Sequence, residues 1–334
     1  MFKKIAKRIL SREVLKHWRF IRVKKVFTSS YRYDLSRFVR SSDRVSMTST
    51  SLLGRIIREY HVIEKGLTMP ECRMGFGKEV LMVLIENCLR YIQWFGYDNE
   101  QLKHAISVVL EYEMFHSTHN FVLDSDLQRA IDQMKFASKH SIFSKQKELT
   151  STDYFSAVEA PFPKFAESRS SVRNYSEEEI PINIIEDAIE IARSTPSACN
   201  RQCWRTYLFT DKVRIKEILN VQGGNRGFGH LADKLIVVAA EVSVFTGPGE
   251  RNQPFVDGGM YAMNLLYSLH YKKIAACILN CSNTIEKDKK LRELCGIRES
   301  EVFIAMVACG KAPDNIKVAV SKRHNLYTTH KTIY

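Results

Sequence analysis

The sequence Ser168-Arg-Ser-Ser-Val-Arg173 is followed, after one apolar-periodic segment, by Thr195-Pro-Ser-Ala-Cys-Asn-Arg-Gln-Cys-Trp204. The first stretch places two guanidinium groups and three hydroxyl groups within six residues, which suits a phosphate that carries nearly two negative charges. The second is a turn of small residues that ends in amides and a tryptophan, and such groups can approach and hydrogen-bond a planar ring. Together they predict a site for a ligand with both a phosphate and a ring.

The apolar pattern after residue 165 alternates between helices and strands. Helices are expected at 184–194, 212–219, 258–270 and 286–294, and strands at 206–210, 234–242, 274–279 and 302–309. The alternation predicts a β-sheet covered by helices. An apolar content of 45% supports a core of that size.

Residues 51–140 show apolar residues at intervals of three and four only, which predicts a small helical module. Its helices are expected at 52–64, 78–95, 101–115 and 127–136. Residues 141–165 contain Lys, Ser, Thr and two prolines and are interpreted as a linker. The predicted domains are an arm at 1–40, the helical module at 41–150 and a catalytic domain at 151–334.

The net charge of +13 is concentrated at the N-terminus. Residues 1–40 hold 13 Lys and Arg against Glu13 and Asp34, whereas the remaining 294 positions hold 37 basic and 35 acidic residues. Residues 1–27 also carry apolar residues at helical spacing. This segment is interpreted either as a helix that packs against the protein or as an attachment to an anionic membrane surface or acidic partner. No specific nucleic-acid partner is predicted.

Eight cysteines without dense pairing favour a reducing cytosol, with peripheral membrane contact through the arm as the alternative. No apolar run reaches the length of a membrane-spanning helix. Four pairs of potential metal ligands lie close in sequence: His61 and Glu64, His116 and His119, Cys199 and Cys203, and Cys277 and Cys281. No full ligand set converges in the sequence, so helix-surface polar groups and incidental thiols are favoured and no metal site is predicted.

Four separated motifs occur in order over residues 165–334. They are Arg169-Ser-Ser-Val-Arg173, the Thr195–Trp204 stretch, Asp257-Gly-Gly with Asn264-Leu-Leu, and Ser321-Lys-Arg323. In this order and spacing, the C-terminal half resembles the nitroreductase family of FMN-dependent oxidoreductases. The resemblance implies an α+β fold with a central β-sheet flanked by helices, here preceded by an all-α N-terminal module.

The resemblance also implies roles for individual residues. Three arginines, at 169, 173 and 323, would hold the FMN phosphate, serine groups would bond phosphate and ribityl, and Asn200 would bond the ring edge. The full cofactor-binding set is Arg169, Ser170, Ser171, Val172, Arg173, Ser197, Ala198, Asn200, Cys277, Ile278, Leu279, Asn280 and Arg323. No catalytic acid or base is predicted, because the flavin carries the hydride chemistry.

Three features depart from the family pattern. Cys203 stands where a proline is usual, which places a thiol near the predicted flavin edge, and Tyr271-Lys-Lys273 replaces a Gly-containing turn. Only residues 222–231 and 243–256 are free to form lids, so the helical module is expected to supply a pocket wall. The Gly-rich run at 223–229 lacks the context of a phosphate loop and is interpreted as a loop near the flavin or a plain turn.

Three hypotheses for function follow. The favoured one is an FMN-dependent oxidoreductase that passes hydride from NADH or NADPH to a small organic acceptor and forms a homodimer with the flavin at the subunit interface. The second is a flavin-dependent dehydrogenase or tailoring enzyme that acts on a glycan or lipid-linked substrate and does not use NAD(P)H. The third is a binding module for a membrane surface. NADH and NADPH are not distinguished, because the family has no separate nicotinamide fold.

Overall fold

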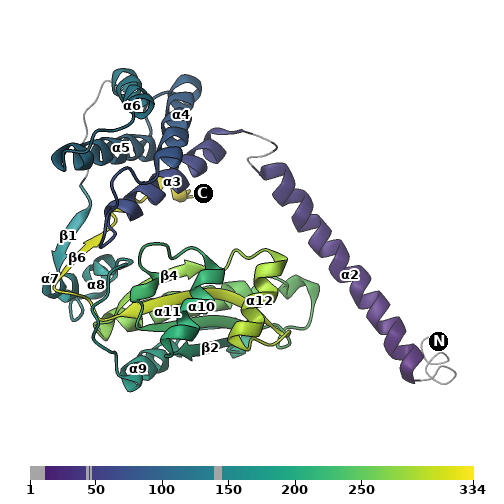
Figure 1. The fold of residues 1–334 in the computed structure, drawn as a ribbon. Helices are drawn as coiled ribbons and strands as arrows, with labels where there is room; N and C mark the ends of the chain where they lie inside the picture. The colour runs from purple at the N-terminus through teal and green to yellow at the C-terminus, as the bar shows by residue number, and fades with distance from the viewer. Residues whose placement is uncertain (1–11, 43–44, 46, 139–144) are drawn as a thin grey trace.

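The computed structural model of this chain describes residues 12–42, 45, 47–138 and 145–334. A long helix, α2 (Arg12–Ser41), extends along one side of the molecule, a group of helices lies at the top of the view, and a sheet domain lies below that group (Figure 1). Residues 1–11, which form the first part of the predicted basic arm, lie outside the described residues.

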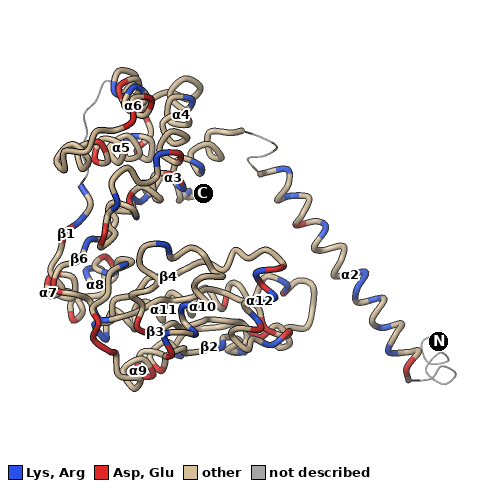
Figure 2. The backbone as a smooth tube through the Cα atoms, in the orientation of Figure 1, with Lys and Arg blue, Asp and Glu red and all other residues tan. Residues whose placement is uncertain are grey.

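Helix α2 contains basic side chains of the predicted arm. Blue Lys and Arg positions recur along its whole length in Figure 2. Its large apolar side chains are also exposed, among them Trp18, Phe20 and Phe38. The helix continues well beyond residue 27, where the amphipathic segment was expected to end. Among the described helices, none combines the length and the apolar character that a membrane span requires.

The helical module contains the four helices that the sequence predicts. They are α3 (Ser49–Leu67), α4 (Lys78–Phe95), α5 (Glu100–Thr118) and α6 (Ser125–Ser138). Two of these helices have an N-terminal side-chain cap. Thr48 accepts the backbone N–H of Ser51 at the start of α3, and Asn99 caps α5 in the same way. The apolar stripes of all four helices meet in one buried core that includes Ile56, Leu84, Val108 and Ile131.

The segment interpreted as a linker is ordered, and that interpretation was wrong. Strand β1 (Lys147–Thr150) pairs antiparallel with β6 (Asn315–Val318), and the short helices α7 (Ser151–Phe155) and α8 (Phe162–Ser168) follow it. The partner strand of β1 lies far along the chain, so no local pattern indicated the pairing. Residues 141–144 of the expected linker lie outside the described residues.

The sheet domain has the helices and strands that the alternating pattern predicts. The predicted helices are α9 (Ile182–Ala192), α10 (Lys212–Gln222), α11 (Gln253–Tyr271) and α12 (Ile285–Cys295). A further short helix near the C-terminus, α13 (Leu326–Thr329), was not predicted. The strands are β2 (Trp204–Phe209), β3 (Lys234–Glu241), β4 (Ala275–Asn280) and β5 (Glu301–Gly310). This mixed architecture behind an all-α module confirms the predicted fold class.

The main sheet has the strand order β2-β3-β5-β4, with every neighbouring pair antiparallel. Helices α9 and α11 pack on one face, where they share a core with Ile236 and Val307. Helices α10 and α12 pack on the other face, with Val237 and Ala308. Strand β4 is an edge strand of this sheet, and Figure 1 places it on the side that faces the helical module.

Candidate functional site

The first motif lies beside the free edge of β4. The backbone N–H of Val172 donates to the carbonyl of Ala276 over 3.1 Å. The hydroxyl of Tyr154 donates to the carbonyl of Ser170 over 2.7 Å, and the buried hydroxyl of Tyr175 lies 2.9 Å from the carbonyl of Val172. These bonds hold residues 169–173 against the strand that the resemblance assigns to the flavin ring.

Two arginines of this motif lack partners in the described part of the chain. Arg173 is only 6% exposed, yet none of the ion pairs or hydrogen bonds formed by the described residues involves its guanidinium group. Nε of Arg169 is buried and also has no hydrogen-bond partner. A cation held at a buried position without a counter-charge is unfavourable. The pair is therefore suited to an anion that the chain itself does not provide.

Arg323 approaches from the C-terminal tail. The tail is fixed on the helical module, because Gln101 Nε2 donates to the carbonyl of Lys322 over 3.1 Å and Ser321 N donates to Glu64 Oε1 over 3.3 Å. Burial raises the pKa of the Tyr60 hydroxyl, and the nearby Arg323 opposes that rise. Arg323 is exposed, and its two preceding residues contact the helical module.

The second motif forms a strained turn at the start of α11. Cys199, Asn200 and Gln202 have φ values of 53°, 56° and 47°, in the left-handed region that non-glycine residues adopt at a cost of about 1 kcal/mol or more. Asp257 of α11 holds the turn, since its carboxylate accepts the backbone N–H of Ala198 over 3.1 Å. Asn200 is left exposed at the tip. Such maintained strain is characteristic of binding turns.

The two motifs lie at opposite ends of α11 within one chain. Ser168 Oγ is 2.8 Å from Nε2 of His270, near the end of that helix, whereas Ala198 is bound to Asp257, near its start. Thirteen residues of α-helix separate His270 from Asp257, a rise of about 20 Å. The sequence predicted one site from both motifs, but within a single chain they contact different ends of α11.

Strand β4, which the resemblance assigns to the flavin ring, exposes only some of the side chains that were predicted to bind the cofactor. Ile278 is 38% exposed and Asn280 is also exposed, whereas Cys277 and Leu279 point into the core. Because side chains alternate along a strand, Cys277 and Leu279 can reach a ligand through their backbone groups alone. Burial raises the pKa of the Cys277 thiol, and the neighbouring Arg173 opposes that rise.

Cys203 does not place a thiol at the open edge of the site. Its side chain is fully buried, and burial, with a contribution from Asp257, raises its pKa to about 11. A buried protonated thiol is chemically inert. The turn directs the Cys203 side chain into the core, so the thiol expected near the flavin edge is not exposed within this chain.

The Tyr271-Lys-Lys273 segment, which stands where the family has a Gly-containing turn, has a strained backbone. Lys273 has a φ of 56°, a conformation that glycine adopts without cost. The Gly-rich run forms the end of α10, since Gly223 caps that helix in the left-handed conformation. The run therefore lacks the helix-opening context of a phosphate loop, and its predicted position near the flavin stays a prediction.

The paired histidines and carboxylates of the helical module form hydrogen bonds with each other and with the backbone. Glu64 is fully buried and contacts Nδ1 of His61 at 3.2 Å and Nε2 of His104 at 2.8 Å. His116 instead accepts the backbone N–H of Gly75 over 2.9 Å. Within the described ranges, no three His, Cys, Asp or Glu side chains are grouped for a metal ion.

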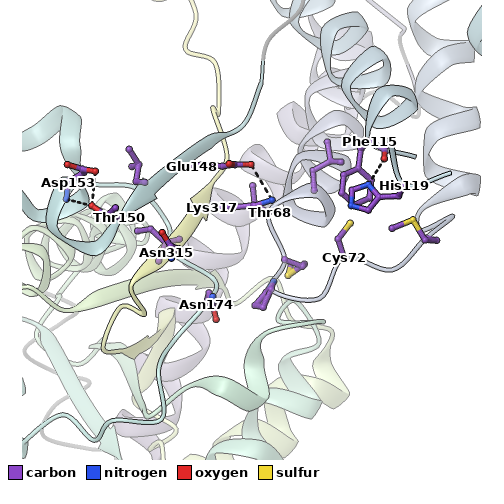
Figure 3. A pocket seen from close by; sticks show the side chains of 16 residues that line it. Thr68, Cys72, Phe115, His119, Glu148, Thr150, Asp153, Asn174, Asn315 and Lys317 are labelled. Atoms are coloured by element: carbon purple, nitrogen blue, oxygen red, sulfur yellow. Dashed lines mark hydrogen bonds and ion pairs between the residues drawn. The ribbon is translucent and has the colours of Figure 1, made fainter. Parts of the chain in front are cut away.

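A cavity of about 690 Å³ separates the helical module from the β1–β6 ribbon (Figure 3). Its walls mix apolar side chains such as Met69 with polar ones, and an ion pair of 3.3 Å joins Lys317 to Glu148 at one side. Asn174, which directly follows Arg173 in the sequence, is part of the lining. The helical module thus forms one wall of this cavity. The 169–174 segment links the cavity, which Asn174 lines, to the edge of β4, which Val172 contacts.

Comparisons with known proteins identify the family. A sequence profile described as "Nitroreductase family" matches residues 166–223. A protein of Archaeoglobus fulgidus, provisionally named as an NADH dehydrogenase/NAD(P)H nitroreductase, is 30% identical over 154 residues, which are 45% of this chain and 85% of that protein. The chain belongs to the nitroreductase family.

Two solved structures are similar to the C-terminal half. An FMN-dependent nitroreductase of Clostridium difficile covers 51% of this chain and 98% of its own, with 17% identity and a TM-score of 0.44. A nitroreductase of Desulfovibrio desulfuricans, solved with FMN, covers 52% and 97%, with 20% identity and a TM-score of 0.43. Family membership supports a flavin oxidoreductase in general terms, and the profile match at residues 166–223 includes neither the helical module nor the arm.

Proposed function

We propose that this protein is an FMN-dependent oxidoreductase that takes hydride from NADH or NADPH and passes it to a small organic acceptor. The observation that carries the proposal is Arg173, a buried residue whose guanidinium group has no counter-charge among the described residues. Its neighbour Arg169 has a buried unpaired Nε. The phosphate of FMN supplies the dianion that both groups need.

The residues beside β4 fit the rest of the cofactor. Arg169 and Arg173 would hold the phosphate, and Ile278 and Asn280 offer an exposed strip of strand to the ring. Bound FMN would supply the hydride chemistry, so the chain needs no acid–base pair. The task of the chain is to bind the phosphate, orient the ring along β4 and exclude water from one side of it.

The separated half-sites favour a homodimer. Val256, Met260 and Met263 form an exposed apolar stripe on α11 at spacings of four and three, which is the pattern of a helix–helix contact. A two-fold axis across this stripe would set two α11 helices antiparallel. The 195–204 turn of the partner subunit would then meet residues 169–173 of this chain, and the two motifs would form one site at the interface.

The visible spectrum of the purified protein tests the proposal. A yellow protein whose colour disappears on anaerobic addition of NADPH or NADH is the expected result. The double variant Arg169→Ala/Arg173→Ala should be colourless, whereas Arg193→Ala/Arg214→Ala, which removes two surface arginines, should stay yellow. A colourless wild-type protein that takes up no added FMN would refute the proposal.

A second candidate is suggested by the exposed apolar and basic side chains of α2. In this case the flavin site would act on a glycan or lipid-linked substrate near an anionic membrane and would not use NAD(P)H. Rapid bleaching of the flavin by NADH or NADPH in stopped-flow mixing would exclude this candidate. Sedimentation with anionic but not zwitterionic vesicles, lost on deletion of residues 1–41, would support the membrane contact by itself.

A further inference from the structure

A pocket of about 760 Å³ lies between helices α10 and α12 and the Gly-rich run at 223–229. The two helices share one buried core on the same face of the main sheet. Among the described residues that line this pocket, five are basic and none is Asp or Glu. The basic residues are Lys216, Arg226, His230, Lys287 and Lys290. We call this hollow the basic pocket.

The Lys and Arg side chains of the basic pocket form no ion pair within the described part of the chain. Two carboxylates that neighbour these lysines in sequence already have other partners. Glu217 pairs with Arg214 over 3.3 Å, and Asp288 pairs with Arg292 over 2.6 Å. Glu286 is exposed and is not part of the lining. Like charges that gather around one hollow repel each other and attract an anion with several negative charges.

The Gly-rich run adds backbone donors to the basic pocket. The backbone N–H groups of Asn225, Arg226 and Gly227, which all line the pocket, have no acceptor among the described residues. Nζ of Lys287 would lie 3.6 Å from a Cβ placed at Gly223, so this ammonium group lies close to the start of the run. Successive N–H groups in a turn beside cationic side chains are typical of phosphate-binding hollows.

A hydrogen bond connects the basic pocket to strand β4. Nε2 of Gln222, the last residue of α10, donates to the carbonyl of Asn280 over 3.0 Å, and its Oε1 accepts the backbone N–H of Gly224 over 2.7 Å. The 169–173 motif contacts the same strand at Ala276. Four residues of strand separate these two contacts, a length of about 13 Å. The basic pocket therefore adjoins the opposite end of β4 from the proposed FMN phosphate site.

We infer that the basic pocket is a second anion site, which binds a ligand with two or more phosphate groups. A single phosphate would leave most of its cationic side chains without a counter-charge. A nicotinamide dinucleotide electron donor and a phosphorylated acceptor share the required chemistry, and either has to bring its reacting group to the flavin ring. The site itself does not depend on flavin, whereas its assignment to a donor or an acceptor rests on the proposed function.

Isothermal titration of full-length, FMN-saturated protein with inorganic pyrophosphate tests the site. The variant Lys287→Met/Lys290→Met keeps both unbranched stems and removes two charges. It should bind pyrophosphate about 5- to 30-fold more weakly than wild type. Lys287→Arg/Lys290→Arg, which keeps both charges, should bind like wild type.

The matched control is Lys289→Met/Lys331→Met. It removes the same number of charges from two exposed lysines that do not line the pocket, and Lys289 lies on the same helix as Lys290. Its affinity for pyrophosphate should stay within about two-fold of wild type, because charges outside the pocket are screened by salt.

Competition identifies the ligand. The oxidised dinucleotides NADP+ and NAD+ are the competitors, since they cannot reduce the flavin. Displacement of pyrophosphate by either dinucleotide assigns the pocket to the electron donor, and the stronger competitor identifies which of the two donors it favours. Pyrophosphate binding that neither dinucleotide displaces assigns the pocket to a phosphorylated acceptor.

Two results would overturn the inference. One is a wild-type protein that binds no pyrophosphate, and the other is an unchanged affinity in Lys287→Met/Lys290→Met. A wild-type protein that takes up no FMN would instead refute the proposed function. In that case the titration is carried out without FMN in Arg169→Ala/Arg173→Ala, where pyrophosphate cannot bind at those arginines, so the two failures are separable.

Discussion

The guanidinium group of Arg251 binds the carboxylate of Asp34 through two hydrogen bonds, of 2.5 Å from Nε and 2.7 Å from Nη2. This pair docks helix α2 on the short helix η3 (Pro248–Glu250). Glu250 of that helix in turn binds Arg201, a residue of the strained 195–204 turn. The arm is therefore connected through two ion pairs to the turn that the family resemblance assigns to the flavin ring.

Arg251→Ala should release α2 from the sheet domain. The expected result is faster hydrogen exchange across residues 26–41, with little change in the exchange of α3–α6. Arg193→Ala is the control, because Arg193 pairs with Glu190 on an exposed face of α9. Arg251 lowers the pKa of Asp34, so the docking should hold above the ordinary pKa of a carboxyl group and weaken as the pH falls below it. Unchanged exchange in Arg251→Ala would show that other contacts hold the arm.

Gly310→Ala should destabilise the segment that carries the first motif. A Cβ at Gly310 would lie 2.6 Å from Cβ of Tyr175, whose hydroxyl lies 2.9 Å from the carbonyl of Val172. Overpacking of this kind costs about 1–3 kcal/mol, so both the free energy of unfolding and the FMN affinity should fall. In Gly54→Ala of α3, by contrast, the new Cβ has no neighbour within 4 Å, and the change should stabilise by about 0.5–1 kcal/mol. Urea denaturation of both variants measures the difference, and an unchanged Gly310→Ala would contradict the packing argument.

Met260→Glu should separate the proposed dimer. A charge in the exposed apolar stripe of α11 cannot be buried against a second copy without loss of its hydration. The variant should elute as a monomer in light-scattering chromatography and should lose flavin on dilution, because each half-site would stand alone. Val213→Glu on α10 is the control, since Val213 is exposed away from that stripe. A monomeric wild type that retains flavin would contradict the proposed interface.

His270 should make stability depend on pH in a defined window. Burial, with repulsion from Arg169, lowers its pKa from 6.5 to about 4. Between these values the unfolded chain binds a proton that the folded chain does not, so the free energy of unfolding should fall as pH decreases from 6.5 to 4. The slope should approach about 1.4 kcal/mol per pH unit. His270→Gln should flatten this part of the profile, and an identical slope in the variant would assign the effect to other groups.

The local elements of this fold were predictable because their signals are local. Helical spacing identified α4 to the residue, and the Asp211 cap placed the start of α10. The β1–β6 pairing was missed, because each strand is short and its partner is distant in sequence. The inward direction of Cys203 was also missed, since it depends on three left-handed residues whose types do not predict that conformation.

For the candidate site, the sequence by itself determined the residue types: two arginines within five residues, a turn of small residues with amides, and the family to which they belong. Tertiary structure decided where these groups meet. It buried Arg173 without a counter-charge among the described residues and placed the second motif at the far end of α11. The physical reason is that residue types and short spacings are properties of a local segment, whereas burial and charge repulsion arise only when distant segments pack together.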